Sequence, residues 1–263
     1  MKSIFFVIAA GLLASATAAS AASPFDGTWQ FDISAAKLPA QPFTVTIKDG
    51  QFDCVSCDPR FSVPADGKYH ALPNDKRADE GAVTIVDPHT IRIDYRKGGE
   101  LLYTETDRVA PDGNSLTYTS TSHTTTNGQA STETGTQVRV GAIDPAAHLA
   151  SGSWRTIKLA SETPSSYRIT FKLVHQQLTV SNGVGAHFTA TLGGPFVPME
   201  GTRIPAMVAV RQTGPRTLVE IFQRDGKTRT TNTVTIAGNG NTATLTSKDA
   251  SNGSVTTFPG KRI

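Results

Sequence analysis

TIRIDYRKGGELLYTETDRV, residues 90–109, is the stretch of sequence that decides the fold. Between residues 91 and 95 apolar and charged side chains alternate, which is the period-two pattern of a half-buried strand. The pair Gly98-Gly99 then accepts the positive φ values that a tight hairpin turn requires. We therefore expect two antiparallel strands, one on each side of this turn.

The same pattern occurs a second time as TLVEIFQRDGKTRTTNTVTI, residues 217–236. Apolar, turn and threonine positions of the two halves keep one constant offset of 127 residues from Gly67, which is matched by Gly194, to Ser120. The opening Gly-Thr-Trp of residues 27–29 likewise returns as Gly-Ser-Trp at residues 152–154. Chance does not preserve such a register, so the chain contains a duplicated module.

Each half is predicted to consist of short strands and turns. The sequence predicts module 1 over residues 22–141, a linker over 142–151 and module 2 over 152–263, each of about 110–120 residues, a usual domain size. In the first half the expected strands are near 28–33, 42–48, 51–55, 68–71, 82–86, 89–97, 100–109 and 115–122, with a ninth around 134–140. Consecutive hairpins favour a meander, and closure removes exposed strand edges. The expected fold is all-β, with two tandem antiparallel meander β-barrels.

The first residues have the three parts of a secretory signal peptide. Lys2 gives the positively charged start, and residues 4–13 form an apolar run that is too short to span a bilayer. Ala19-Ser20-Ala21 is a small-x-small cleavage site. We expect residues 1–21 to be removed after Ala21 and the protein to be periplasmic or secreted. The alternative is a retained membrane anchor.

Composition excludes several classes of protein. Charged residues make up only 18% of the chain, and β-branched residues are plentiful, which argues against disorder. Two cysteines in 263 residues exclude a disulfide-rich mini-protein. The net charge is +3 without a basic run, so nucleic acid is not an expected partner. Apart from the first segment, no stretch is apolar enough for a membrane span.

The Gly-x-Trp that opens each half resembles the opening motif of lipocalin-like (calycin) barrels. The resemblance implies that Trp29 and Trp154 each close one end of a barrel, with a basic side chain of the last strand lying across the indole. We expect Arg139 to cover Trp29, and Lys261 or Arg262 to cover Trp154. The whole pattern is similar to a group of exported bacterial proteins of unknown activity that carry two such modules. The resemblance therefore implies a fold and no activity.

Cys54 and Cys57 form a Cys-x-x-Cys motif. A thiol-redox site needs a helix N-terminus or nearby cations to lower the thiol pKa, whereas Asp53 and Asp58 flank this motif. A structural disulfide is therefore the favoured interpretation, and a redox site or half of a zinc site is the alternative. No second cysteine pair and no paired histidines are present, so we expect no metal site.

Four side chains are candidate ligand-binding residues on inward barrel faces: Tyr95, Tyr103, Glu220 and Phe222. For Glu220, the direction in which the side chain points depends on the register of its strand. If Leu218 and Phe222 point inward, Glu220 does too and can hold a polar ligand group, but a shift by one residue turns it outward and is the more ordinary arrangement.

Carboxylates at Glu100, Glu105 and Asp107 are not preserved in the second half, which favours solvated strand faces over acid–base catalysis. Matching threonines in both halves, Thr104 and Thr106 among them, are expected to lie on an exposed sheet face. No catalytic or nucleotide-binding motif is present, so no cofactor is expected and an enzyme is the less favoured class.

The leading functional hypothesis is an exported, non-catalytic protein that binds a small apolar or amphipathic molecule or an envelope component. The rival from another class is a protein-binding module, such as an inhibitor of an exported hydrolase, that acts through loops. A thiol-redox protein that uses Cys54 and Cys57 is the third alternative.

Overall fold

The computed structural model describes residues 23–263, so the predicted signal peptide and its cleavage site lie outside the described residues. The first ten strands are β1 (Gly27–Phe31), β2 (Phe43–Lys48), β3 (Gln51–Cys54), β4 (Phe61–Pro64), β5 (His70–Ala71), β6 (Glu80–Asp87), β7 (Thr90–Lys97), β8 (Glu100–Val109), β9 (Ser115–Ser122) and β10 (Ser131–Val140). All nine strands predicted for the first half are present, and β4 was not predicted.

The second half begins with β11 and contains one short 3₁₀ helix, η1. Its elements are β11 (Gly152–Ser161), η1 (Pro164–Tyr167), β12 (Arg168–Val174), β13 (Gln177–Asn182), β14 (His187–Thr191), β15 (Val197–Pro198), β16 (Met207–Gly214), β17 (Thr217–Arg224), β18 (Lys227–Ile236), β19 (Thr242–Asp249) and β20 (Val255–Arg262). In residues 23–263 no helix has the length and apolar character needed to cross a membrane.

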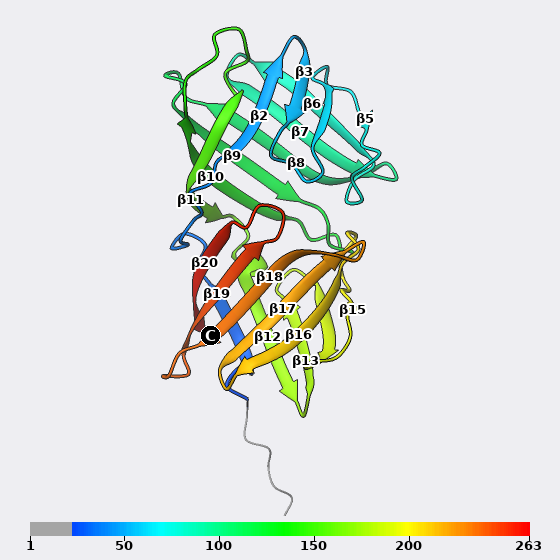
Figure 1. The fold of residues 1–263 in the computed structure, drawn as a ribbon, viewed down its shortest axis with the longest axis vertical. Coiled ribbons are helices and arrows are strands. Elements are labelled where there is room, and N and C mark those ends of the chain that lie inside the picture. Colours follow the sequence, from blue (N-terminus) through cyan, green and yellow to red (C-terminus); the bar gives the residue numbers. More distant parts are fainter. Residues whose placement is uncertain (1–22) are drawn as a thin grey trace, which may run out of the picture.

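The strands form two antiparallel sheets of ten strands, each rolled into a nearly closed barrel, which confirms the predicted fold class. The first barrel runs in the order β4-β3-β2-β11-β10-β9-β8-β7-β6-β5, and the second in the order β14-β13-β12-β1-β20-β19-β18-β17-β16-β15. Single bridges, such as Asp66 with Thr84 in the first barrel and Leu192 with Val210 in the second, join segments near the sheet ends. Figure 1 shows the barrels stacked end to end along the long axis.

The opening strand of each half is exchanged between the barrels. β1 pairs with β12 and β20, and its blue ribbon lies in the lower barrel of Figure 1. β11 instead completes the first barrel between β10 and β2. The predicted modules 22–141 and 152–263 are therefore wrong in their first strands. The first barrel is a contiguous segment that spans β2 to β11, and the second barrel is interrupted by it.

Local pairing explains this exchange. β11 directly follows β10 and pairs with it over eight positions, whereas β1 pairs with β20 over only three. Pairing β10 with β11, its neighbour in sequence, closes a shorter loop than pairing β10 with β1 at the far end of the module. The loss of chain entropy is therefore smaller. Once β11 has completed the first barrel, β1 is the remaining strand for the second.

Each barrel is closed at one end by a tryptophan with an arginine across it. The guanidinium of Arg262 lies 4.3 Å from the ring centre of Trp29, and that of Arg139 lies 4.1 Å from Trp154. An arginine lies across each tryptophan, as the resemblance implies, but the expected pairing of Arg139 with Trp29, and of Lys261 or Arg262 with Trp154, is wrong. The cause is the exchange of β1 and β11.

Hydrogen bonds fix both closures in the same way. Trp29 and Trp154 donate from Nε1 to the carbonyls of Phe25 and Ala150, each at 2.9 Å. Each arginine donates to three backbone carbonyls; those of Arg139 belong to Gly113, Leu149 and Ser151. The glycine of each Gly-x-Trp has a positive φ, and a Cβ there would collide with the arginine, so the motif requires glycine.

The open ends of the two barrels face each other. Arg203 of the second barrel donates to Glu100 at the start of β8 at 2.9 Å, and Thr125 bridges Thr202. Tyr167 of η1 donates its hydroxyl to Glu133 of β10. These contacts, made by loops of both barrels and by η1, form the junction between the two barrels.

Candidate ligand-binding site

A β-bulge decides which residues of β8 face the interior of the first barrel. The register of β7 and β8 shifts between Tyr95 and Arg96, so Tyr95 lies opposite Tyr103. Counting straight back from the Gly98-Gly99 turn would instead have paired Tyr95 with Leu102. A shift by one residue exchanges the two faces of a strand.

The inward residues of β8 are therefore Tyr103, Glu105 and Asp107. Glu105 pairs with Ile93, and Asp107 pairs with Ile91, which is fully buried. The expectation that these two carboxylates lie on a solvated face is wrong, although Glu100 is exposed as expected. Thr104 lies on the opposite face, where it donates to Asp94.

Hydroxyl groups connect the carboxylates on this inner face. Tyr103 donates its hydroxyl to Glu105 Oε2 at 2.6 Å, and Ser120 of β9 donates to Tyr103 Oη at 2.5 Å. Asp107 is buried, and its Oδ1 has no hydrogen-bond partner among the described residues. A buried oxygen without a donor is unfavourable unless a proton, a water molecule or a ligand satisfies it.

Glu133 of β10 joins this inner face to the second barrel. Tyr118 of β9 donates to Glu133 Oε1 at 3.0 Å, and Tyr167 of η1 donates to Oε2. The ring of Tyr167 also packs 6.3 Å from Phe258, which belongs to the second barrel. Tyr167 therefore contributes to both barrels.

A cavity of about 230 Å³ opens on this network at the junction. Its lining residues are Tyr103, Ser120, Ser122, Ser131, Thr132, Glu133, Ser166 and Tyr167. A larger groove of about 550 Å³ also borders Tyr167, and its lining residues are Gln30, Phe31, Asp32, Ile33, Ser34, Ala160, Ser161, Pro164, Tyr167, Pro259, Gly260 and Lys261. We call the smaller cavity the junction chamber.

The electrostatics of the chamber follow from burial of acidic groups without a basic neighbour. Burial raises the pKa of Asp107, and the nearby carboxylate of Glu105 raises it further. Burial likewise raises the pKa of Glu105, a rise that the hydrogen bond from Tyr103 opposes. Burial and the adjacent carboxylates raise the pKa of Tyr103, Tyr118 and Tyr167, so these hydroxyls remain neutral donors.

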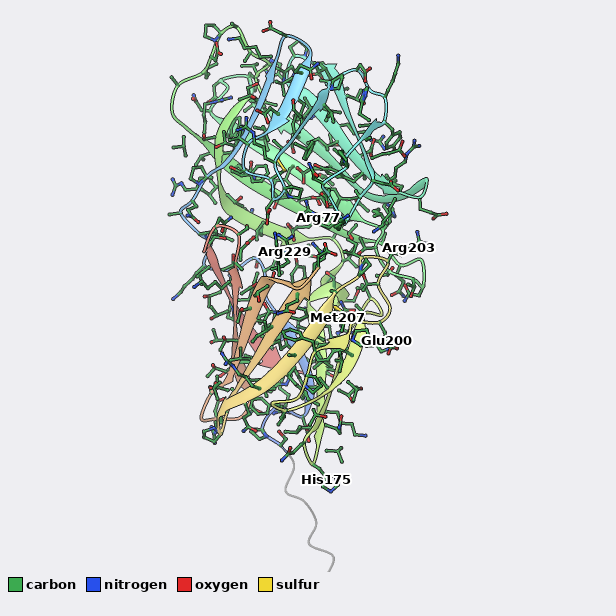
Figure 2. All side chains as sticks on the ribbon, turned by 45° about the vertical axis from the view of Figure 1, so that its right-hand side comes forward. Arg77, His175, Glu200, Arg203, Met207 and Arg229 are labelled. Carbon is green, nitrogen blue, oxygen red and sulfur yellow. A yellow bond between two sulfur atoms is a disulfide. The ribbon has the colours of Figure 1, made fainter. Side chains whose placement is uncertain are left out.

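Arginines surround the junction outside the chamber. Arg77 forms a bidentate pair with Asp75, with Nε–Oδ1 at 3.0 Å and Nη2–Oδ2 at 2.7 Å. Arg229 of the second barrel pairs with Asp58 of the first. Figure 2 shows Arg77 and Arg229 near the contact between the barrels. The Arg229–Asp58 pair and the Arg203–Glu100 pair both connect the two barrels.

The second barrel has a different interior. The same bulge, here between Phe222 and Gln223, places Glu220 opposite Asn232. Glu220 is only 4% exposed and lies inward beside Leu218, so the inward register holds and not the more ordinary outward one. Asn232 donates to Glu220 Oε2 at 3.4 Å, and burial raises the pKa of Glu220 to about 7.

The predicted ligand-binding residues divide between the barrels. Tyr95 and Tyr103 lie in the first, with ring centres 6.0 Å apart, while Glu220 and Phe222 lie in the second. They do not form one site. Of these four, only Tyr103 lines the junction chamber.

Sequence reasoning placed Glu105 and Asp107 on the wrong face of β8, and it singled out none of the lining residues except Tyr103. The signal that would have found the first two is the pairing of Tyr95 with Tyr103, which requires knowledge of the bulge. Tyr167 could not have been found from the repeat, because it lies in the connection between two strands that belong to different barrels.

Cys54 and Cys57 form a disulfide, as expected. Cys54 is 1% exposed and packs in the core of the first barrel beside Phe52 and Val45. A buried sulfur is poorly accessible to an external thiol, which disfavours the alternative of a redox site.

The chamber is equipped for hydrogen bonding, because its lining consists of hydroxyl-bearing side chains and the carboxylate of Glu133. Within residues 23–263, no group of His, Cys, Asp and Glu side chains is arranged to hold a metal ion. No protein-family model matches the chain, and no curated protein shows significant sequence similarity to it.

Proposed function

We propose that this chain is an exported, non-catalytic protein that binds a small molecule in the junction chamber. The observation that carries the proposal is the chamber itself, a polar cavity of about 230 Å³ at the open end of a barrel whose other end is closed by Trp154 and Arg139. Ligand sites typically occur in the mouths of β-barrels and at the contacts between domains, and the chamber is at both.

The character of the lining changes the expected ligand. Sequence patterns favoured an apolar or amphipathic molecule, but seven of the eight lining residues carry a serine, threonine or tyrosine hydroxyl, and the eighth is Glu133. The cavity is also smaller than the roughly 300–1,000 Å³ of pockets for drug-sized ligands. We therefore infer a small, polar ligand.

Two further features support export of the protein and its relationship to lipocalin-like barrels. The Cys54–Cys57 disulfide is typical of proteins in an oxidising compartment, which supports export. The arginine stacked on each Gly-x-Trp tryptophan supports kinship with lipocalin-like barrels.

Native mass spectrometry of the protein recovered from its own host without denaturation tests the proposal. We expect a co-purified small molecule that is lost in Ser131→Leu, because Ser131 lines the chamber and its side chain makes no hydrogen bond among the described residues. The matched control is Thr119→Leu on the neighbouring strand, where the side chain is exposed and points away from the chamber. A bound molecule retained equally by both variants contradicts the proposed site.

A further inference from the structure

We propose that three arginines at the contact between the barrels, Arg77, Arg224 and Arg229, form a binding site for a phosphate group. None of them lines the junction chamber, so this site is separate from the one in the proposed function. Arg77 belongs to the loop between β5 and β6 of the first barrel, whereas the other two lie on β17 and β18 of the second. Figure 2 shows Arg77 and Arg229 at this contact.

The β-bulge of the second barrel sets the position of Arg229. The register of β17 and β18 shifts between Phe222 and Gln223, which leaves Arg229 as the extra residue without a partner on β17. A bulge redirects the side chain of its extra residue, and Arg229 reaches Asp58 of the first barrel. The extra residue of the corresponding bulge in the first barrel is Leu102, which is buried. The fold itself therefore does not require an arginine at this position.

The three guanidinium groups do not have a full set of partners. Arg77 is held bidentately by Asp75, and Arg229 donates from Nη1 to Asp58. Nε of Arg229 is buried and has no acceptor among the described residues. Arg224 donates from Nε to a backbone carbonyl at the long distance of 3.4 Å, and it pairs with no carboxylate within residues 23–263. One of the three charges is therefore left without a counter-ion.

The surplus charge of Arg224 cannot be removed by a change of protonation. Burial lowers the pKa of Arg224, and the positive charges of Arg77 and Arg229 lower it further, an effect that requires neighbouring charges. Asp75 and the exposed Asp225 offset only part of this repulsion. A buried carboxyl group can take up a proton, whereas a guanidinium stays charged at neutral pH. A bound anion would remove the remaining penalty.

The number of donors favours a phosphate group over a carboxylate. Guanidinium groups match the oxygens of both. A carboxylate has only two oxygens, and one bidentate arginine occupies both, as Arg77 does with Asp75. A phosphate group has three acceptor oxygens and more charge, so it can accept from several arginines at once. Solvent reaches the site, because the side chains of Arg77 and Arg229 are 39% and 27% exposed.

Isothermal titration calorimetry of the purified protein with sodium phosphate, in chloride buffer at constant ionic strength, tests this inference. We expect phosphate to bind at least about tenfold more tightly than acetate. Arg224→Gln should weaken phosphate binding about tenfold or more, because it removes the charge without a counter-ion and leaves both aspartates paired. The matched control is Arg211→Gln, which removes an exposed arginine from β16 and should leave binding unchanged.

Thermal unfolding gives a second readout. Phosphate should raise the melting temperature of the native protein, since a ligand that binds only the folded state stabilises it, and should not raise that of Arg224→Gln. In chloride alone, Arg224→Gln should melt at or above the temperature of the native protein, because it removes a repelling charge. A much lower melting temperature in chloride would mean that Arg224 stabilises the contact between the barrels, and would overturn the inference.

Two further probes identify the source of the phosphate group. Glycerol 3-phosphate represents a soluble ester, and vesicles of phosphatidylcholine with phosphatidic acid represent a lipid headgroup. Binding of either one that is lost in Arg224→Gln supports the site. Acetate that binds as tightly as phosphate overturns the inference. Phosphate binding that Arg224→Gln leaves unchanged, or a failure of all the phosphate probes to bind, also overturns it and leaves the proposed function of the chamber standing.

Discussion

Glu220 is a carboxyl group in the core of the second barrel without a basic partner. One of its oxygens, Oε1, and Oδ1 of Asn232 are both buried and lack a donor among the described residues. A proton on Glu220 satisfies both groups, because the acid hydroxyl can donate to the amide oxygen while the amide donates to the acid. The side chain therefore fits its surroundings in the neutral form.

This environment predicts a pH-dependent stability. The pKa of Glu220 is about 7 in the folded protein against an ordinary value of 4.5, so the folded state binds the proton more tightly. The stability contributed by Glu220 is therefore fully present below pH 4.5 and is lost as the pH rises to about 7, by up to about 3 kcal/mol. Glu220→Gln stays neutral and keeps a donor for Asn232, so it should be close to the native protein at low pH and more stable near pH 8.

Urea unfolding of both proteins near pH 5 and near pH 8 checks this prediction. Comparing the two proteins cancels the contributions of other titrating groups, Glu105 and Asp107 included. Parallel pH profiles for the native protein and Glu220→Gln would show that Glu220 is ionised and solvated at neutral pH.

At the scale of elements, strands were predictable from sequence and their partners only in part. Alternation and glycine turns located nine of the strands in the first half, because these signals are local. Which side chains of β8 point into the barrel was not predictable. The bulge beside Tyr95 places Glu105 opposite Ile93, where an unbroken register would place Thr104. The exchange of β1 and β11 was not predictable either, because Trp29 and Trp154 carry the same motif and suit either barrel.

The strand exchange makes a prediction for the arginine–tryptophan pairs. A double-mutant cycle with Trp29→Phe and Arg262→Met should give a coupling energy of about 1 kcal/mol, since the guanidinium lies on the indole ring. The same cycle with Trp29→Phe and Arg139→Met should give nearly zero, because Arg139 lies on Trp154. Chemical unfolding followed by circular dichroism measures both. A coupling confined to Trp29 and Arg139 contradicts the exchanged topology.

At the scale of the whole molecule, the first barrel is inserted into the second after its first strand. All ten of its strands lie between β2 and β11, so its core is contiguous in sequence. The two open ends then face each other, and the junction chamber takes its lining from β8, β9, β10 and η1. The chamber therefore belongs to the pair of barrels, because η1 follows the last strand of one barrel and precedes a strand of the other.

This architecture predicts which fragment folds. Residues 40–163 contain every strand of the first barrel together with Trp154 and Arg139, so this fragment should unfold cooperatively on its own. Residues 40–141 lack both β11 and β1 and should not, because β10 and β2 lose their partner and the core loses Trp154. Thermal unfolding followed by circular dichroism distinguishes the two. A cooperative transition in residues 40–141 alone would contradict the insertion.

The central claim is that the junction chamber holds a small molecule. The most direct measurement is a high-resolution crystal structure of the protein purified from its own host under non-denaturing conditions. We expect electron density for a small non-protein molecule in contact with Glu133 and Tyr167. A chamber that contains only ordered water, with a bound molecule elsewhere on the protein, would contradict it.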